Sequence, residues 1–341
     1  MKISMVVKAY PTSRPGGMPF VCQDRARALV ELGHEVHVLT AGLRNKQSIL
    51  DDRGVCVNHF ACKSDEYSDE FARKCVEHCK WFQPQILHSD SFDVHRPWWK
   101  DRPSSYRMAV TLHGFCWGSW FTKWNAWRIG VGDFLTLDEP MARKFAKEAE
   151  LLGCADVVIG ISRHEHYLLR DQLGLLHAKL VHNPICQSFF DHPIAPLPDQ
   201  RRFIVASISG AATRGFDDAV KCAEILGFAI DRANKVPRDQ MWTQYDAASA
   251  LVLPTCYSQG ADLTVSESIA RGRPVIVTGT GSYLRESEPG GIWHGSTVLV
   301  PIGNQDALLR AMAGKLPEAL PGSMLLHRPV EHATKWLEAV S

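Results

Sequence analysis

The chain has 341 residues, more than one ordinary domain, and its length suggests two domains with separate cores. Apolar residues make up 45% and charged residues 22%, a composition that argues against disorder. With 38 Lys and Arg against 37 Asp and Glu, the net charge is +1, so a nucleic-acid partner would need a local basic patch. No apolar run reaches the roughly 18 residues of a membrane span, and the first residues lack the apolar core of a signal peptide. We expect a cytoplasmic protein without a transmembrane segment.

The ten cysteines are scattered along the chain. Without a secretion signal, we expect reduced thiols rather than a disulfide framework. Six Cys and His residues are close together in the sequence, and a zinc site could use such ligands, but no Cys-x2-Cys pair is present. Small buried side chains are the preferred interpretation of this group. Its members are Cys56, His59, Cys62, Cys75, His78 and Cys79.

In the first half of the chain, apolar runs alternate with helical patterns, as is typical of parallel α/β proteins. The first strand is expected at 3–7, followed by a loop of glycines and prolines and a helix that stops at Gly33. Further strands are expected at 35–41, 54–61, 84–90, 106–114, 155–162 and 178–185.

The pattern breaks near residue 185, where three prolines within 191–202 indicate a linker. A second series follows, with strands at 202–209, 227–233, 250–255, 274–279 and 296–303 and helices near 214–226, 240–248 and 263–271. We therefore predict an α/β protein with two Rossmann-like domains facing across a cleft, residues 1–190 and 200–328. The apolar stripe of the last helix predicts that residues 329–341 pack back on the first domain.

Three loops at the expected strand ends carry residues of chemical interest. Gly16 and Gly17 precede a helix, so the backbone there could approach an anionic ligand closely, or the loop could be a plain turn. His113 leaves a strand where catalytic groups lie in open α/β sheets, although a half-buried structural histidine would look the same. The segment 259–272 is a glycine loop entering a helix, with Glu267 about one turn in. A diphosphate on the helix N–H groups and ribose hydroxyls on Glu267 would suit it, and an ordinary surface helix is the alternative.

Together these motifs resemble the family-4-type retaining glycosyltransferases of the GT-B fold. The resemblance covers most of 1–310 and depends on the order of LGHEVHVLTAG, TLHG, ADVVIGIS with HNPI, Arg214-Gly215, LVLPT and RGRPVIVTGTGS. It implies a nucleotide-diphosphate sugar as the donor substrate, bound by the C-terminal domain, and no separate cofactor. Gly16 and Gly17 would approach the donor phosphates and sugar, and His113 would contact the sugar near the reacting carbon.

The sequence departs from the family at the donor site. The Arg and Lys that usually clamp the diphosphate correspond to Ser209 or Gly210 and to Arg214, so two cations become one. The usual pair of glutamates becomes Gln259 and Glu267, of which Glu267 keeps the ribose-binding role. The resemblance thus implies His113 and Arg214 as catalytic residues. The implied donor-binding residues are Gly16, Gly17, Ser209, Val236, Gln259, Gly260, Leu263, Thr264 and Glu267.

Residues 96–147 hold six of the ten tryptophans and nine Lys or Arg against four Asp or Glu, a local excess of +5. In GT-B enzymes the N-terminal domain binds most of the acceptor, which makes this segment a candidate acceptor platform. Aromatic faces with cations suit a sugar ring, a lipid interface or an extruded nucleobase. The tryptophans could instead pack a long connection onto the domain. The candidate acceptor residues are Trp117, Trp120, Trp124, Trp127 and Arg128.

We therefore predict a retaining hexosyl- or pentosyltransferase. No Asp-x-Asp motif is placed at a strand end, so we expect no metal, and Arg214 with backbone N–H groups would stabilise the departing diphosphate. The acceptor would be a glycan or lipid-linked sugar, or a hydroxymethylated pyrimidine in DNA, as in phage-type transferases. A non-catalytic nucleotide-sugar-binding protein of the same fold is the alternative. Gln259, in place of a carboxylate, argues against a third possibility, a sugar-phosphate epimerase.

Overall fold

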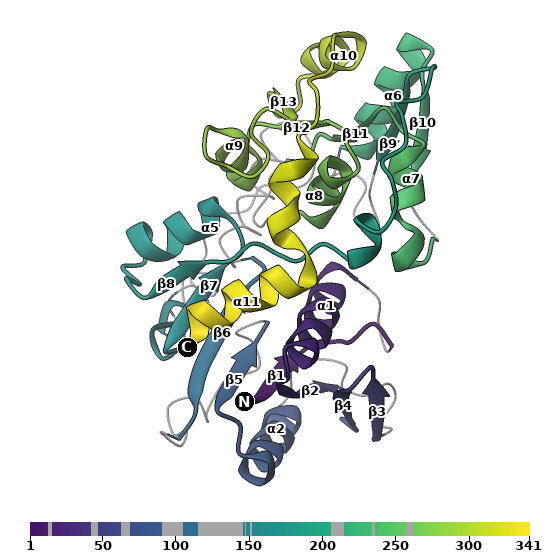
Figure 1. Cartoon of the computed structure of the whole chain (residues 1–341). Coiled ribbons are helices and arrows are strands. Elements are labelled where there is room, and N and C mark those ends of the chain that lie inside the picture. The colour runs from purple at the N-terminus through teal and green to yellow at the C-terminus, as the bar shows by residue number, and fades with distance from the viewer. Residues whose placement is uncertain are drawn as a thin grey trace.

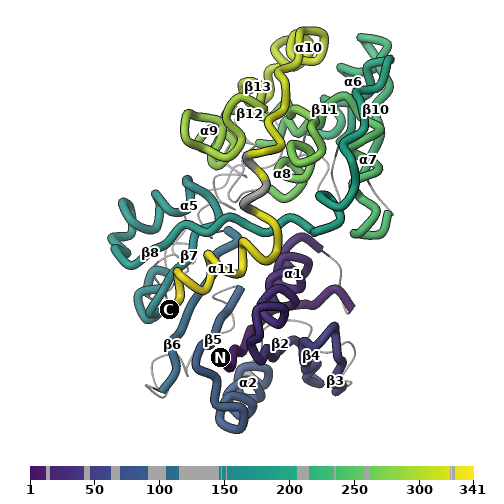
Figure 2. The backbone as a smooth tube through the Cα atoms, in the orientation of Figure 1, coloured from purple at the N-terminus to yellow at the C-terminus, as the bar shows by residue number. Residues whose placement is uncertain are grey.

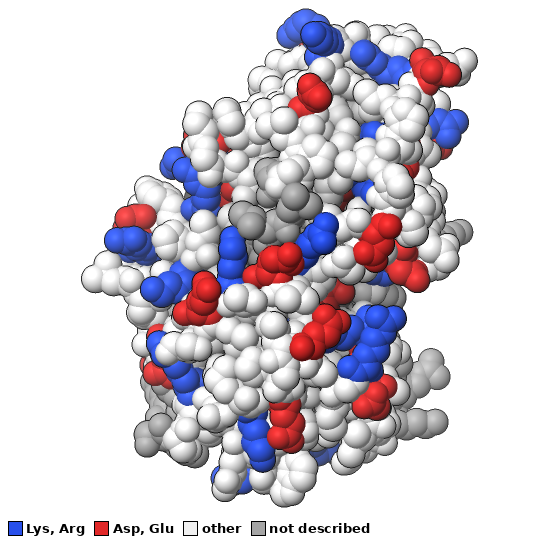
Figure 3. Space-filling view, in the orientation of Figure 1, with Lys and Arg blue, Asp and Glu red and all other residues white. Residues whose placement is uncertain are grey.

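The computed structural model describes the chain in eleven ranges, within which two α/β units follow one another (Figure 1). Among the described residues, no helix has the length and hydrophobicity needed to cross a bilayer. On the face shown in Figure 3, acidic and basic side chains of the described residues are interspersed. The described ranges are 1–12, 16–41, 47–62, 69–90, 105–114, 146, 148–150, 152–205, 215–233, 236–256 and 262–341.

The first unit is built on an eight-stranded sheet of order β3-β4-β2-β1-β5-β6-β7-β8. All neighbours pair in parallel except β3 and β4, which form an antiparallel hairpin through Arg53 and Gly54, both at positive φ. The strands are β1 (Lys2–Val7), β2 (Glu35–Ala41), β3 (Ser48–Asp52), β4 (Val55–Phe60), β5 (Ile86–Ser89), β6 (Arg107–Leu112), β7 (Val157–Gly160) and β8 (Ala178–Leu180).

Helices cover both faces of this sheet, so its central strands are apolar on both sides. Ile3, Met5 and Val7 of β1 contact the core beneath α1 (Gly17–Glu31), whereas Val6 joins the opposite core beneath α2 (Asp69–Phe82). Cys62, Cys75 and Cys79 are buried hydrophobes of that second core. The short helix α5 (Arg163–Tyr167) continues as one π-helical turn at 168–172.

The second unit has a five-stranded, fully parallel sheet of order β10-β9-β11-β12-β13. Gly215, at φ 64°, begins α6 where a Cβ would collide with the carbonyl oxygen of Pro254, so glycine is required there. The strands are β9 (Arg202–Val205), β10 (Ala229–Arg232), β11 (Ala250–Leu253), β12 (Val275–Thr278) and β13 (Thr297–Val300). The helices are α6 (Phe216–Leu226), α7 (Trp242–Asp246), α8 (Leu263–Ala270), α9 (Gly281–Ser287) and α10 (Gln305–Ala313).

The proline-rich linker between the sheets is held by two buried arginines of the second unit. Arg271 donates to the carbonyl oxygens of Phe189, His192 and Pro193 at 2.6–2.9 Å. Arg273 donates to those of Ala195 and Pro196 at 3.0 Å. Because these side chains satisfy backbone acceptors that no strand pairs, the linker has a defined path along α8.

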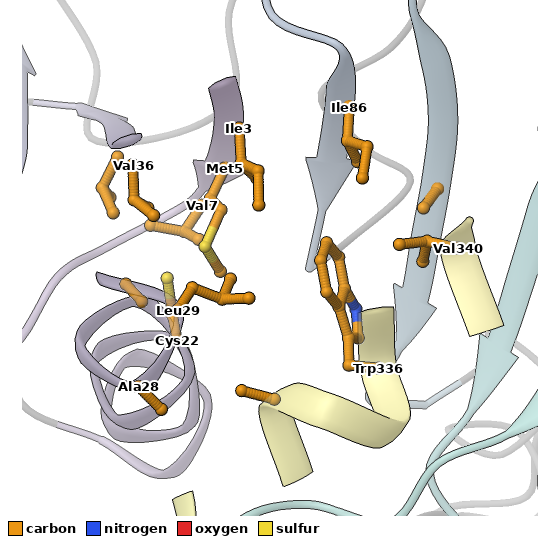
Figure 4. Close-up of a cluster of buried hydrophobic side chains, with 14 of the residues drawn as sticks. Ile3, Met5, Val7, Cys22, Ala28, Leu29, Val36, Ile86, Trp336 and Val340 are labelled. Carbon is orange, nitrogen blue, oxygen red and sulfur yellow. The ribbon is translucent and has the colours of Figure 1, made fainter. Parts of the chain in front are cut away.

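The last helix, α11 (Pro329–Val340), crosses from the second unit to the first (Figures 1 and 2). It packs on α1, and its Trp336 and Val340 enter the core formed with Ile3 and Met5 of β1 (Figure 4). The final residues thus complete the hydrophobic core of the N-terminal unit.

The two units also touch where α5 meets α9. Ser162 and Ser282 share a hydrogen bond of 2.9 Å, and Glu286 accepts from the backbone N–H of Arg163 at 2.6 Å and from His182 Nε2 at 3.1 Å. Burial by itself would raise the pKa of Glu286, but these donors lower it. The carboxylate of Glu286 therefore stays charged in this contact between the two units.

Candidate functional site

The carboxyl ends of parallel strands meet at one edge of each sheet, and two helices that begin at these edges face each other. A Cβ built on Gly17 would lie 3.9 Å from Leu263 Cδ1, so the first turn of α1 lies opposite the first turn of α8. Gly16 has an extended backbone and room for a Cβ, with its nearest neighbour, Pro19, at 3.6 Å. Neither glycine is required by the local fold, and both leave this surface without a side chain.

The first turn of α8 has backbone N–H groups that the helix itself does not satisfy. The N–H groups of Val265 and Ser266 bond the carbonyl of Asp262, which leaves those of Leu263 and Thr264 without an acceptor within the helix. The Asp262 side chain does not cap the helix, because its carboxylate accepts from the hydroxyl of Tyr283. Such a helix start can hold an anion, although the charge of Asp262 works against it.

Glu267, one turn into α8, is buried and engaged at both oxygens. Oε1 forms an ion pair with Nη1 of Arg238, and Oε2 accepts from the hydroxyl of Tyr245 at 3.0 Å. Burial, and then the Glu267 charge, raise the pKa of Tyr245 well above its usual value, so the phenol keeps its proton and donates. Each carboxylate oxygen has a second lone-pair direction, through which Glu267 can still accept from a ligand hydroxyl.

Arg238 connects this carboxylate to the N-terminal unit. Its guanidinium lies 5.3 Å from the ring centre of Phe20 on α1 and 5.6 Å from that of Phe189. Asp24, one turn further along α1, is close enough for its charge to interact with Arg238, yet burial dominates and raises the pKa of Asp24 to about 6. A cation and a carboxyl group therefore interact through their charges at the domain boundary, with no hydrogen bond between them.

His113 follows β6, and its imidazole Nε2 lies 3.1 Å from Oδ1 of Asp90, which follows the neighbouring strand β5. The same oxygen accepts from Nη1 of Arg25 at 2.7 Å, and the side chains of Asp90 and Arg25 are 0% and 1% exposed. Burial would raise the pKa of Asp90, but Arg25, with His88 and His113, lowers it well below its usual range. An ionised Asp90 accepts a hydrogen bond from Nε2–H of His113. In a neutral imidazole this tautomer has its lone pair on Nδ1.

Behind Asp90, the polar network continues into the last helix. Arg25 Nε donates to Nε2 of His332 on α11 at 3.0 Å, and Nδ1 of His332 lies 2.8 Å from the carbonyl oxygen of His182. Burial, and then the charge of Arg25, lower the pKa of His332 well below its usual value, so its imidazole is neutral. Arg25 is therefore held by two hydrogen bonds, from Nε to His332 and from Nη1 to Asp90.

Two adjacent residues of α1 interact with the two groups of candidate site residues, one in each unit. Asp24 lies by the Arg238–Glu267 pair of the second unit, and Arg25 bonds the Asp90 that bonds His113. Of the predicted donor-binding residues, the structure brings Gly17 of α1 next to Leu263, in the helix that also holds Thr264 and Glu267. Val236 lies half-buried just before Arg238.

Several predicted site residues lie outside the described ranges. Within those ranges, no group of three or more His, Cys, Asp and Glu is arranged to hold a metal ion. The predicted residues not described are Ser209, Arg214, Gln259 and Gly260 at the donor site and Trp117, Trp120, Trp124, Trp127 and Arg128 at the acceptor site.

Sequence reasoning missed Asp90, Arg25 and Arg238. Asp90 had a detectable signal, because it ends an apolar strand next to the strand of His113. Arg25 and Arg238 had no such signal in the sequence, since their partners, Asp90 and Glu267, lie 65 and 29 residues away.

Comparisons with known proteins agree on the family and the fold. The model of the Glycosyltransferase Family 4 matches residues 15–187, whereas no curated protein matches the chain in sequence. Sucrose-phosphate synthase from Thermosynechococcus elongatus has a similar structure, with a TM-score of 0.69 and 16% identity over 99% of this chain and 94% of that chain. HepE of Anabaena in complex with UDP has a TM-score of 0.65 and 12% identity, over 99% of both chains.

A third similar structure is that of trehalose-6-phosphate synthase from E. coli bound with UDP-2-fluoroglucose, with a TM-score of 0.66 and 10% identity. It covers 99% of this chain and 98% of that chain. At such low identities these likenesses establish the fold, and the prediction of two Rossmann-like domains in the GT-B arrangement is confirmed.

Proposed function

Because the chain belongs to glycosyltransferase family 4, we propose that it transfers a sugar from a nucleotide-diphosphate sugar to an acceptor hydroxyl with retention of anomeric configuration. One observation carries this proposal: α1 starts opposite the open first turn of α8 and, through Arg25 and Asp90, orients His113. A donor diphosphate at α8 would then have its sugar on the side of the N-terminal domain, where an acceptor enters.

In this proposal the chain stabilises the leaving group electrostatically. The N–H groups of Leu263 and Thr264 and the cation of Arg214 hold the diphosphate as its charge develops. Glu267 accepts from ribose hydroxyls, and Nδ1 of His113 accepts from a sugar hydroxyl near the reacting carbon. No metal ion takes part in the proposed step.

The surroundings of Asp90 support attack of the acceptor from the same face as the leaving group. Its carboxylate is the one that the described residues place against His113, and it is fully covered. A carboxylate held by Arg25 and His113 does not reach an anomeric carbon without breaking both contacts. We therefore favour front-face substitution over a covalent enzyme intermediate.

The test begins with thermal shifts by UDP-, GDP-, ADP- and TDP-sugars, because a ligand that binds the native state raises its melting temperature. With the donor that binds, we expect slow hydrolysis without acceptor, loss of this hydrolysis in His113→Ala, and the donor's anomeric configuration in the transfer product. Binding without any hydrolysis or transfer would instead support a non-catalytic nucleotide-sugar-binding protein.

For the acceptor we propose a glycan or lipid-linked sugar, or a hydroxymethylated pyrimidine in DNA. The +5 excess and six tryptophans of residues 96–147 support the DNA acceptor. Transfer of labelled sugar to duplexes with hydroxymethylcytosine or hydroxymethyluracil, beside unmodified duplex, separates the two. DNA binding should weaken steeply with salt because neutralised phosphates release counterions. Failure to label either modified duplex would leave the glycan or lipid acceptor.

A further inference from the structure

Arg238 holds a cation at the boundary of the two domains. It follows Val236 in the second unit, pairs with Glu267 of α8, and packs on Phe20 in the first turn of α1. Phe20 is three residues after Gly17, which faces Leu263. One guanidinium therefore touches both helices whose first turns border the candidate donor site.

The hydrogen bonds of this guanidinium are incomplete. A guanidinium has five N–H donors, and Nη1 donates to Glu267. Nε and Nη2 are buried and find no acceptor in the part of the chain that the structure describes. Buried donors without a partner are costly, above all on a charged group, so three N–H groups of Arg238 lack the acceptors that a ligand could supply.

The neighbouring groups fix the guanidinium without neutralising its free edge. Phe20 and Phe189 offer aromatic faces, which attract the cation but are no substitute for oxygen acceptors. Asp24 does not bond Arg238, and its Oδ2 also lacks a hydrogen-bond partner among the described residues. Arg238 is thus held in place along its Glu267 edge, while its other edge remains unpaired.

The chemistry of such a site suits a phosphorylated nucleoside. Arginine binds phosphate oxygens through two parallel N–H bonds, and a carboxylate beside it accepts from hydroxyl groups. A nucleoside diphosphate carries ribose hydroxyls and a 5′-phosphate on the same sugar, separated by the C3′ to C5′ carbons, so a carboxylate and a neighbouring arginine such as Glu267 and Arg238 could each bind one of them. We propose that Arg238 binds the donor diphosphate and supplies a second cation besides Arg214. This inference rests on the proposed function, because it requires a nucleotide sugar in this cleft.

The experiment compares ligands that differ only in phosphate. Binding of uridine, UMP and UDP, and of the adenosine, guanosine and thymidine series, is measured by calorimetry for the full chain and for Arg238→Gln. We expect Arg238→Gln to weaken binding of the diphosphate at least tenfold and of the nucleoside less than twofold. Arg238→Lys keeps the charge but not the paired N–H donors of the guanidinium, so its affinity for the diphosphate should lie between those of wild type and Arg238→Gln.

Arg285→Gln is the matched control. Arg285 lies in the same domain, pairs with Glu288 at 3.6 Å and lies 5.2 Å from the ring of Tyr167, but it is 44% exposed on α9. Arg285→Gln should leave the affinities for nucleosides, monophosphates and diphosphates unchanged. Melting temperatures of the unliganded variants report whether Arg238→Gln still folds, and Arg238→Lys provides the comparison if it does not.

Four results would overturn the proposal. An equal loss for nucleoside and diphosphate would mean that Arg238 contacts the ribose or only supports the fold. Tighter binding of both in Arg238→Gln would mean that Arg238 blocks Glu267. Wild-type protein that binds none of the diphosphates would refute the proposed function as well, whereas unchanged diphosphate affinity in Arg238→Gln would refute the role of Arg238 alone.

Discussion

Replacing Trp336 by alanine should remove a large part of the contact between the last helix and the N-terminal domain. Trp336 is fully buried, its ring lies edge-on to His88 at 5.0 Å, and the Arg25 guanidinium lies 5.9 Å from its centre. A tryptophan buries roughly 150–250 Å². At about 25 cal/mol per Å² this corresponds to about 4–6 kcal/mol. Measured losses for such substitutions are about 3–5 kcal/mol, a large share of the stability of one domain.

Trp336→Phe is the informative companion. The indole Nε1 has no hydrogen-bond partner among the described residues, so phenylalanine loses some packing but also removes a buried unpaired donor. We expect Trp336→Phe to cost less than about 1.5 kcal/mol.

The assay is urea unfolding followed by far-ultraviolet circular dichroism, because the remaining tryptophans complicate fluorescence. Trp81→Ala is the control, since Trp81 belongs to the same domain but is 74% exposed, and it should change the free energy of unfolding by less than about 0.5 kcal/mol. If Trp336→Ala lowered the free energy of unfolding no more than Trp81→Ala, the last helix would not be part of the core. The hydrogen bond from Arg25 to His332 of that helix would then not hold Arg25 in place either.

Three further predictions concern the site. Asp90→Asn should lower kcat at least tenfold with little change in donor Kd, because an amide no longer fixes the tautomer of His113; an unchanged kcat and pH profile would remove Asp90 from the orientation of His113. Glu267→Ala should weaken donor binding by about 1–3 kcal/mol in calorimetry, the usual range for losing a charge-assisted hydrogen bond. Asp24→Asn should raise the melting temperature at pH 7.5 but hardly at pH 4. The folded pKa of Asp24 is raised to about 6, so the folded protein binds its proton more tightly and loses stability as pH rises from about 4 to 6. An equal effect at both pH values would contradict this burial cost.

The alternation of apolar runs and helices was sufficient to predict the fold class. Parallel strands are buried on both faces and therefore read as short apolar runs such as Val275–Thr278, which the prediction placed to within one residue at each end. The edge strand Ser48–Asp52 was missed, because its residues are mostly exposed and two of the five are acidic. Its signal lay in the Arg53-Gly54 turn rather than in the strand itself.

The candidate site was only partly predictable, for a physical reason. Gly17, His113 and Glu267 stand in local motifs, so a strand end or a helix start identifies them from neighbouring residues. Asp90 and Arg238 acquire their roles from partners on other elements, Arg25 and Glu267, and only the packing of α1 against both domains brings those partners together. Long-range ion pairs of this kind leave no periodic trace in a sequence.

The return of the last helix also bears on how the chain is made. The core of the first domain contains Ala333, Trp336 and Val340, and Arg107 of β6 donates to the backbone carbonyl oxygen of Ser341. Domains usually fold in order as they leave the ribosome. Here the first domain lacks part of its core until the second has been synthesised, so the domain translated first is the one completed last. A nonsense codon that removes only residues 329–341 should therefore expose the apolar surface between α1 and β5 in a chain whose second domain is intact.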